Sequence, residues 1–396
     1  MTVICLKYRI YPSKSQITEI TGMLKTCRQI YNSMLLWRKV AWETEQISVN
    51  RYEQKMALPV WKGETDETGN LLHPELSVVN AQVLQQVVDR VDLADKAFFR
   101  RVQSDEKPGF PRFKGRGRYN SLTYVQDTAF SIGDDYIRFS KIGQIKAVLH
   151  RKVEGKLKQC VLSRQGLGWY ACITIEAEPL LLPENNDAVA LDLGLEKFAV
   201  LSNGEVIENP RFFRHHEKRL AKAQRKLAKD KRNRARQRTV SRIHTKVRHQ
   251  RHDFVHKLAN SLIALYGIFF LEDLNPNNMS KRPTPKKDDD TGAFLPNGAA
   301  QKSGLNKSIL DAAWTMFRTI LKQKAERAVN RRVVEINPAY TSQDCHKCGY
   351  RPGKEAKKKL SDRWHYCPKC SASLDRDLNA AMNIFALGTQ RIGESP

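Results

Sequence analysis

The spacing of apolar residues changes twice in the first half of the chain. Residues 2–10 alternate between apolar and polar side chains and precede Pro12, which predicts a half-buried β-strand. Over residues 14–104 apolar positions recur at three- and four-residue steps, the period of two or more amphipathic helices. We expect the N-terminal strand to complete a small β-barrel with later strands. Those strands lie within residues 121–176, among them 136–139, 144–149 and 169–175.

The second half begins after a linker-like segment at residues 178–187 and has a different order of elements. Asn203-Gly204 predicts a tight hairpin turn. A stretch rich in Pro, Lys, Asp and Gly at residues 281–304 predicts a mobile loop, and residues 309–330 predict a helix. The predicted strands are residues 188–193, 198–201, 205–207, 267–272 and 332–336.

Three acids stand out against these elements. Asp192 lies inside an apolar strand and Glu272 ends another, where an ionised carboxylate is costly unless it binds a metal or a cation. Asp375 and Asp377 compete as the third acid, at the start of the last helix. We expect Asp375 to be the N-cap of that helix and Asp377 to face the sheet. A hairpin-led mixed sheet with acids on separate elements resembles the layout of a ribonuclease H-like nuclease.

Carboxylates in this arrangement predict a magnesium site. Taken singly, an acid in a strand or at a helix start is more often structural. Jointly, Asp192, Glu272 and Asp377 can hold two Mg²⁺ ions about 4 Å apart. One ion would lower the pKa of an attacking water, and the other would stabilise the leaving oxygen of a phosphodiester. Oxygen ligands suit this hard cation.

Four of the eight cysteines form two Cys-x-x-Cys pairs, Cys345 with Cys348 and Cys367 with Cys370. Four thiolates at this spacing are typical of a closed, tetrahedral structural zinc site. A redox pair, two disulfides or an iron–sulfur site are the alternatives. Because the sequence starts without an apolar leader, we expect no secreted disulfide framework. The histidines His346 and His365 are expected at the surface, and the remaining cysteines are expected to be ordinary buried thiols: Cys5, Cys27, Cys160 and Cys172.

The formal net charge of +26 predicts a polyanionic partner, with nucleic acid as the first candidate. Residues 211–257 hold 18 Lys or Arg against 3 acids and predict a long basic helix or helical hairpin. A run of charged residues is usually a solvated surface without a ligand. The excess of Lys and Arg over acids in this segment is too large for that interpretation. No apolar run reaches the roughly 20 residues of a membrane span, so we expect no membrane partner.

A second basic stretch, residues 109–118, interleaves Phe with cations, a mixture that suits stacking on bases and pairing with phosphates. A basic turn that packs its Phe residues inward is the alternative. From the two basic stretches the candidate nucleic-acid contacts are Arg112, Lys114, Arg116, Arg118, Arg225, Lys226, Arg232, Arg234 and Arg238.

The order and spacing of these motifs resemble the TnpB family, transposon-encoded RNA-guided endonucleases related to type V CRISPR effectors. The resemblance covers nearly the whole length. The segments that carry it are Asp192-Leu193-Gly194, Leu271-Glu272-Asp273-Leu274, Tyr340-Thr341-Ser342-Gln343-Asp344-Cys345, Cys348-Gly349, the second cysteine pair, and the run from Asp375 to Ile384.

The resemblance implies a multidomain α+β protein. Its parts would be a wedge β-barrel at residues 1–13 and 105–182, an inserted helical recognition domain at 14–104, and a RuvC nuclease domain at 183–396 with a zinc-ribbon insertion at 340–373. The loop from Met279 to Asn306 looks longer than in compact members, where this region lies near a lid over the active site.

The implied function is cleavage of target double-stranded DNA beside a transposon-adjacent motif, directed by a guide RNA from the transposon end. No small-molecule substrate is implied. Gln85 matches a position that helps read the motif in the family, although a buried or simply solvent-facing glutamine fits as well. A cytoplasmic protein, nucleoid-associated when bound to DNA, is expected. The rival interpretations are a repressor of the same ancestry that has lost cleavage and a strand-joining transposase.

Overall fold

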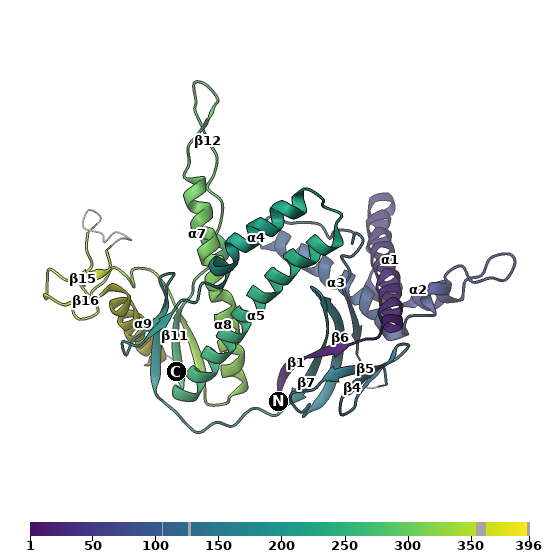
Figure 1. Cartoon of the computed structure of the whole chain (residues 1–396), viewed down its shortest axis with the longest axis horizontal. Coiled ribbons are helices and arrows are strands. Elements are labelled where there is room, and N and C mark those ends of the chain that lie inside the picture. Colours follow the sequence, from purple (N-terminus) through teal and green to yellow (C-terminus); the bar gives the residue numbers. More distant parts are fainter. Residues whose placement is uncertain (105, 126–127, 354–361, 394–396) are drawn as a thin grey trace. The chain divides into compact units, whose positions relative to one another are not determined.

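The structure is a computed structural model that describes residues 1–104, 106–125, 128–353 and 362–393. The chain separates into two compact units, Met1–Glu178 and Pro179–Pro396. Each unit has its own sheet and its own hydrophobic core (Figure 1).

The first unit is built on a seven-stranded antiparallel sheet with the order β2-β6-β7-β1-β5-β4-β3. The N-terminal strand lies in its middle and pairs with β7 from Thr2 opposite Ala177 to Ile10 opposite Trp169. Among the described strands β2 and β3 are edges, so the sheet is an open half-barrel and the expected closure is wrong. The strands are β1 (Thr2–Tyr11), β2 (Ser121–Tyr124), β3 (Phe130–Ile132), β4 (Tyr136–Phe139), β5 (Gly143–Val148), β6 (Lys156–Gln165) and β7 (Gly168–Ala177).

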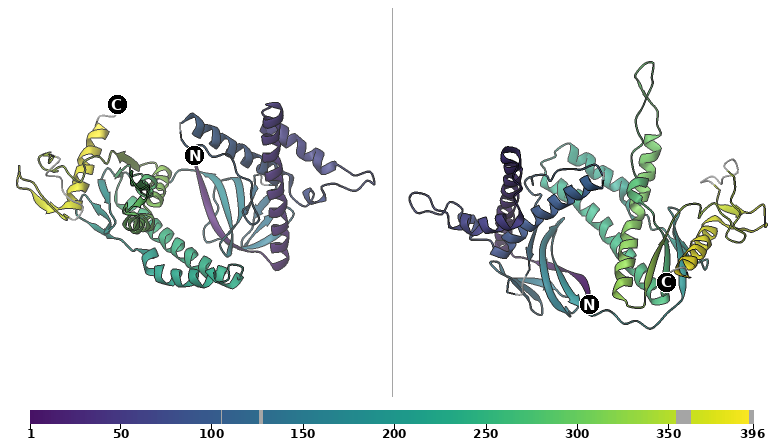
Figure 2. Two further views of the ribbon diagram at one scale, coloured as in Figure 1. Left: turned by 90° about the horizontal axis from the view of Figure 1, so that it is seen from above. Right: turned by 180° about the vertical axis from the view of Figure 1, so that it is seen from behind.

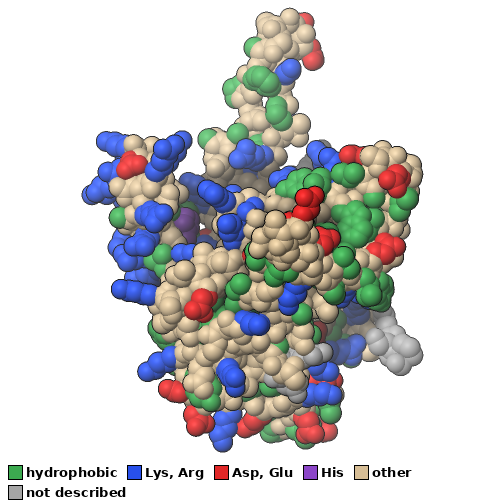
Figure 3. All heavy atoms as spheres, turned by 90° about the vertical axis from the view of Figure 1, so that its right-hand side faces the viewer, with side chains coloured by type: hydrophobic (Ala, Val, Ile, Leu, Met, Phe, Trp, Pro, Cys, Tyr) green, Lys and Arg blue, Asp and Glu red, His purple; other side chains and the backbone are tan. Residues whose placement is uncertain are grey.

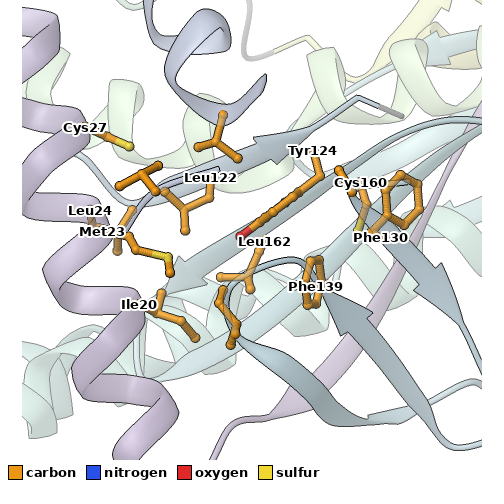
Figure 4. Packing of buried hydrophobic residues seen from close by; sticks show 14 of the residues in the cluster. Ile20, Met23, Leu24, Cys27, Leu122, Tyr124, Phe130, Phe139, Cys160 and Leu162 are labelled. Atoms are coloured by element: carbon orange, nitrogen blue, oxygen red, sulfur yellow. The ribbon is translucent and has the colours of Figure 1, made fainter. Parts of the chain in front are cut away.

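Helices cover one face of this sheet. Helix α1 begins after Ser13, whose hydroxyl accepts a hydrogen bond from Gln16 N while the Gln16 side chain accepts one from Ser13 N. Its apolar stripe packs on the strands, with Ile20, Met23 and Leu24 facing Leu122 and Leu162 (Figure 4). The helices are α1 (Lys14–Glu45), α2 (Arg51–Gly63), the short η1 (Pro74–Leu76) and α3 (Ala81–Gln103).

The second unit holds a five-stranded mixed sheet with the order β10-β9-β8-β11-β14. The first three strands are joined as antiparallel hairpins, and β11 and β14 run parallel to β8. The strands are β8 (Ala188–Leu193), β9 (Lys197–Leu201), β10 (Val206–Glu208), β11 (Ile268–Glu272) and β14 (Arg332–Ile336).

The two faces of this sheet are covered by different helices. Val189, Leu191 and Phe269 belong to the core under α5 (Arg234–Leu265) and α8 (Trp314–Arg327). Ala190 and Phe270 point the other way and pack with Ile384 of α9 (Arg376–Gly393). Side chains alternate between the faces along a strand, so every even-numbered residue of β8 and β11 faces α9.

Residues 211–257 form the predicted helical hairpin. Helices α4 (Phe212–Ala228) and α5 run side by side in both views (Figures 1 and 2). Buried Asp311 joins them, because its carboxylate accepts hydrogen bonds from Phe213 N, at the start of α4, and from the Arg251 guanidinium of α5.

Two expectations for residues 273–330 are wrong in part. The helix predicted at 309–330 is two helices, α7 (Ala299–Ala312) and α8, separated by Ala313 in the left-handed region at φ 59°. The loop at 281–304 contains the start of α7 and a small hairpin of β12 (Lys286–Lys287) and β13 (Phe294–Leu295), which follows α6 (Pro276–Met279). The remaining strands, β15 (Trp364–Tyr366) and β16 (Ser373–Asp375), form a ribbon before α9.

Two predictions about single side chains also fail. Cys5 is exposed and Cys172 only half-buried, whereas Cys27 and Cys160 are buried as expected. His365, the central residue of β15, is buried instead of lying at the surface. No helix in the described ranges combines the length and apolar character needed to cross a membrane.

Candidate active site and metal centre

Two of the predicted acids lie next to each other at the end of the central strands. Parallel pairing aligns Leu271 with Leu191, so Glu272 and Asp192 follow in register on adjacent strands. Both are even-numbered, and both side chains therefore point to the face covered by α9. The carboxyl ends of parallel strands are where α/β sheets place their reactive groups.

The third acid comes from the first turn of α9. Asp375 Oδ1 accepts hydrogen bonds from Asp377 N at 2.9 Å and from Leu378 N at 3.2 Å, the geometry of an N-cap. Lys197 Nζ, at the start of β9, donates to the other Asp375 oxygen at 2.9 Å. Asp375 is thus the cap, as expected, and its oxygens are occupied, whereas Asp377 has no such partners among the hydrogen bonds of the described residues.

The acids repel one another. Burial, followed by the charges of Glu272 and Asp377, raises the pKa of Asp192 well above its ordinary value. Burial also raises the pKa of Glu272, and burial together with the Asp375 charge raises that of Asp377. For Asp375, burial is outweighed by the Lys197 and backbone N–H hydrogen bonds, and its pKa is lowered. A half-buried cluster of acids that resists ionisation suits a divalent cation, which would relieve the repulsion.

Two side chains that the sequence did not single out support this cluster. Thr341 is 3% exposed and donates its hydroxyl to Glu272 Oε1 at 2.5 Å, which opposes the rise in the Glu272 pKa. Lys197 fixes the cap through Asp375. Thr341 lies in the segment before the first cysteine pair, and a buried threonine there has no local signal that distinguishes it from a core residue.

The four cysteines come together as predicted. Within the described part of the chain they form the one group of three or more His, Cys, Asp or Glu whose ligand atoms all lie within 4.8 Å of one another. The Sγ atoms of Cys345 and Cys370, and those of Cys348 and Cys367, are 3.6 Å apart. A disulfide would need about 2.05 Å, and tetrahedral zinc with Zn–S bonds of about 2.3 Å places its sulfurs roughly 3.8 Å apart.

The two cysteine turns have the same backbone geometry. Gly349 N donates to Cys345 O at 2.8 Å, and Ser371 N donates to Cys367 O at 2.9 Å. Both residues that follow the second cysteine adopt positive φ, 67° at Gly349 and 55° at Ser371. Two matching turns that aim four thiols at one point fit a single tetrahedral ion such as zinc.

Polar residues of α9 connect the cysteine turns to the carboxylates. Asn383 Nδ2 donates to the backbone oxygens of Thr341 and Asp344 at 2.8 Å, and Asn379 Nδ2 donates to Asp344 O at 2.8 Å. The Asn379 side-chain oxygen accepts a hydrogen bond from His346 N at 3.1 Å, so the backbone of the first cysteine turn is bound to α9. The segment that carries Thr341 and Cys345 is therefore fixed to the helix that carries Asp377.

The predicted nucleic-acid contacts are all on the surface except one. Lys114 is half-buried: its backbone N–H donates to the Asn32 side chain, and its ammonium lies 5.1 Å from the Tyr31 ring centre. Phe110 and Phe113 are 48% and 50% exposed, so the aromatic side chains are not packed inward. Figure 3 shows blue Lys and Arg side chains gathered along one side of the visible face. The exposed predicted contacts are Gln85, Arg112, Arg116, Arg118, Arg225, Lys226, Arg232, Arg234 and Arg238.

Comparison with known proteins gives relatives over nearly the whole chain. A protein of Escherichia coli (strain K12) named "Putative RNA-guided DNA endonuclease InsQ" is 31% identical over 390 residues, 96% of this chain and 91% of that protein. A "Putative RNA-guided DNA endonuclease" of Streptomyces pristinaespiralis is 32% identical over 391 residues, 96% and 88% of the two chains. The TnpB-like protein MJ1635 of Methanocaldococcus jannaschii is 30% identical over 159 residues, 40% of this chain and 31% of that one. The chain belongs to the TnpB family.

Family models match three parts of this TnpB family member. Residues 172–283 match a "Probable transposase" model and residues 314–384 match "Cas12f1-like, TNB domain". Residues 1–46 match a "Helix-turn-helix domain" model, although here they form strand β1 and the single helix α1.

A solved structure agrees at the level of fold. The protein chain in the "Cryo-EM structure of the Cas12f1-sgRNA-target DNA complex" matches 97% of this chain with a TM-score of 0.51, at 13% identity and over 98% of its own length. The likeness supports a multidomain α+β fold with a half-barrel sheet, as observed.

Proposed function

We propose that this TnpB family member is an RNA-guided DNA endonuclease encoded by an insertion sequence. It binds a guide RNA and cleaves target double-stranded DNA by metal-dependent hydrolysis at Asp192, Glu272 and Asp377. One observation supports this proposal most strongly. Asp192 on β8 and Glu272 on β11 are in register, and both face helix α9, whose first turn contains Asp377. The full-length relatives support the guided activity.

The second unit fits a RuvC nuclease domain. Its sheet combines an antiparallel hairpin series with two parallel strands, and the proposed catalytic acids stand at the ends of the two central strands. The β15–β16 ribbon and the four cysteines fit a structural zinc ribbon inserted at residues 340–373. We assign the wedge to residues 1–13 and 105–182 and the recognition domain to 14–104, with Gln85 exposed on α3 as a candidate reader of the adjacent motif.

The residues of the site have two roles, metal binding and positioning. Asp192, Glu272 and Asp377 would hold Mg²⁺, which when bound would acidify the attacking water and stabilise the leaving oxygen. Thr341 orients Glu272 by donating to one carboxylate oxygen, so the other oxygen would be available to a metal ion. Lys197 and Asp375 fix the first turn of α9 and so the position of Asp377. The zinc ribbon keeps the Thr341 segment on α9 through Asn379 and Asn383.

The assignment of Asp377 over Asp375 can be tested with a matched pair of variants. Asn is as good an N-cap as Asp, so Asp375→Asn keeps the cap, loses only the partly exposed contact with Lys197, and is expected to retain most of the cleavage rate. Asp377→Asn is expected to lower Mg²⁺-dependent cleavage by about a hundredfold to a thousandfold, as removal of a key electrostatic group does. Both proteins are purified with their copurifying RNA and assayed on DNA that carries the matching target. Equal rates for the two variants would contradict the assignment.

The same assay separates the rival functions. A strand-joining transposase would give joined products, and a repressor without cleavage would bind the target and leave it intact. Cleavage products with free ends, lost in Asp377→Asn while target binding persists, are the expected result.

A further inference from the structure

The first unit contains a cationic cavity of about 290 Å³ that no part of the proposed mechanism uses. Its walls come from α1, from the loop at residues 116–120 and from the end of β6. None of the described residues that line it is acidic. The residues that matter for its chemistry are Lys25, Arg28, Arg116, Tyr119, Asn120 and Arg164.

The four cations of this cavity have no acidic partner. Among the described residues, no carboxylate lies within 4.0 Å of Lys25, Arg28, Arg116 or Arg164. Arg28 is held in place, because its guanidinium donates to Lys114 O at 3.3 Å. Converging like charges destabilise the folded state unless an anion neutralises them. The site is therefore suited to an anionic ligand.

Part of the cavity wall is packed against the core of the first unit. Leu24 lines it and is also part of the core between α1 and the sheet, where it lies near Met23 and Leu162 (Figure 4). Tyr119 is 8% exposed, and the Arg90 guanidinium lies 5.1 Å from its ring centre. Gly117 turns the loop at φ +70°, a conformation that favours glycine. Leu24 and Tyr119 thus fix the base of the cavity, and the exposed side chains of Lys25, Arg116 and Arg164 surround it.

The size and lining of the cavity select the ligand. A volume of 290 Å³ lies just below the roughly 300–1,000 Å³ of small-molecule pockets, which is too small for a duplex and suited to one nucleotide. Arginine side chains bind phosphate oxygens in pairs of hydrogen bonds. The buried Tyr119 ring and the Leu24 side chain give the floor an apolar part that a sugar or base can contact, and Asn120 supplies a polar group at the rim.

We propose that this cavity binds a single nucleotide of a nucleic-acid strand. Lys25, Arg116 and Arg164 hold its phosphate, and the charge of Arg28 adds to the positive potential of the cavity. This inference rests on the proposed function, because it takes the nucleic acid as the partner. Guide RNA and target DNA share the phosphodiester chemistry that the cavity recognises, so the experiment must separate them.

The first test is chemical protection of the wild-type protein. Lysines are acetylated and arginines are modified with phenylglyoxal, without nucleic acid, with the copurifying RNA, and with the RNA complex bound to target DNA. Mass spectrometry then measures the extent of modification at each lysine and arginine. We expect Lys25, Arg116 and Arg164 to be protected severalfold, whereas exposed Lys62 serves as the internal reference. Protection by RNA alone identifies the guide as the ligand, and protection that appears only with DNA identifies the target. No protection in either state overturns the proposal.

The second test measures affinity. The variant K25Q/R116Q/R164Q is compared with K62Q/R138Q/K146Q, which removes the same charge from exposed residues of the same unit outside the cavity. Loss of a phosphate contact should weaken binding of the protected ligand at least about tenfold and reduce the slope of log K against log salt by about 0.7 for a single strand. Equal effects in the two triple variants overturn the proposal. Both tests read binding, so they remain decisive even if guided cleavage is never observed.

Discussion

Replacing Asp192 with Asn should stabilise the protein while it abolishes cleavage. The substitution keeps the shape of the side chain and removes its charge from a site where burial, Glu272 and Asp377 all oppose ionisation. Each unit by which folding raises a carboxyl pKa makes its ionised form about 1.4 kcal/mol less stable. Because burial and the neighbouring acids raise the Asp192 pKa well above its ordinary value, Asp192→Asn should be more stable than the wild type without Mg²⁺. The gain should appear as a higher Tm for Asp192→Asn than for the wild type.

The sign of this effect depends on pH. A carboxyl whose pKa is raised by folding binds a proton more tightly when folded, so its unfavourable contribution is absent below the unfolded pKa of about 3.9. The cost grows as the pH rises from there towards the folded pKa. The Tm difference between Asp192→Asn and wild type should therefore be small near pH 4.5 and larger at pH 8.

The assay is differential scanning fluorimetry in Mg²⁺-free buffer without a chelator, because a chelator would also remove zinc from the cysteines. Millimolar Mg²⁺ should raise the Tm of the wild type and have little effect on Asp192→Asn. A variant that is less stable than wild type at pH 8 without Mg²⁺ would refute the electrostatic reasoning, since the acid would then be stabilising the fold.

Three further substitutions test the support of the site. Thr341→Val removes the hydrogen-bond donor to Glu272 and should lower kcat about tenfold. It should also move the acidic limb of the pH–rate profile to higher pH, and Thr341→Ser should restore both kcat and the profile. Elemental analysis of the wild type should find one zinc per chain. Cys348→Ser should lose this zinc and increase hydrogen exchange in α9, whereas Cys5→Ser at the surface should keep the zinc. Lys197→Met should cost at most about 1 kcal/mol at pH 7, because Asp375 is 35% exposed. That loss should vanish as the pH falls through the lowered Asp375 pKa.

Each of the three has a result that would count against it. Unchanged kinetics in Thr341→Val would mean that its hydrogen bond does not orient Glu272. Full zinc content in Cys348→Ser would contradict four-cysteine ligation. A Lys197→Met effect that stays constant down to pH 2 would place its origin outside the ion pair with Asp375.

The strands that carry the acids could be predicted because their pattern is local. Residues 188–193 form β8 with the predicted bounds, and the strand predicted at 267–272 is β11, which begins one residue later at Ile268. Continuous apolar runs between turn residues are typical of buried parallel strands. The cap at Asp375 could also be predicted, since it depends on the next three residues alone. The cysteine cluster follows from spacing within two short turns.

Features that depend on tertiary contacts could not be predicted. The break between α7 and α8 lies at Ala313, a residue with high helix propensity, and the adjacent Asp311 is committed to Arg251 and to the start of α4. His365 is buried although it lies on the short strand β15, and this burial depends on packing that the local sequence does not specify. The barrel was predicted closed because alternation reports strands and not whether the two edge strands meet.

Reprogramming the guide tests the central claim most directly. The RNA that copurifies with the protein is sequenced, its variable end is replaced with a new sequence, and a plasmid that carries the new match beside the adjacent motif is supplied with Mg²⁺. We predict that the cut moves to the new match and is absent with Asp192→Asn. Cleavage that stays at the old site, or that proceeds equally with Asp192→Asn, would contradict RNA-guided hydrolysis at these three carboxylates.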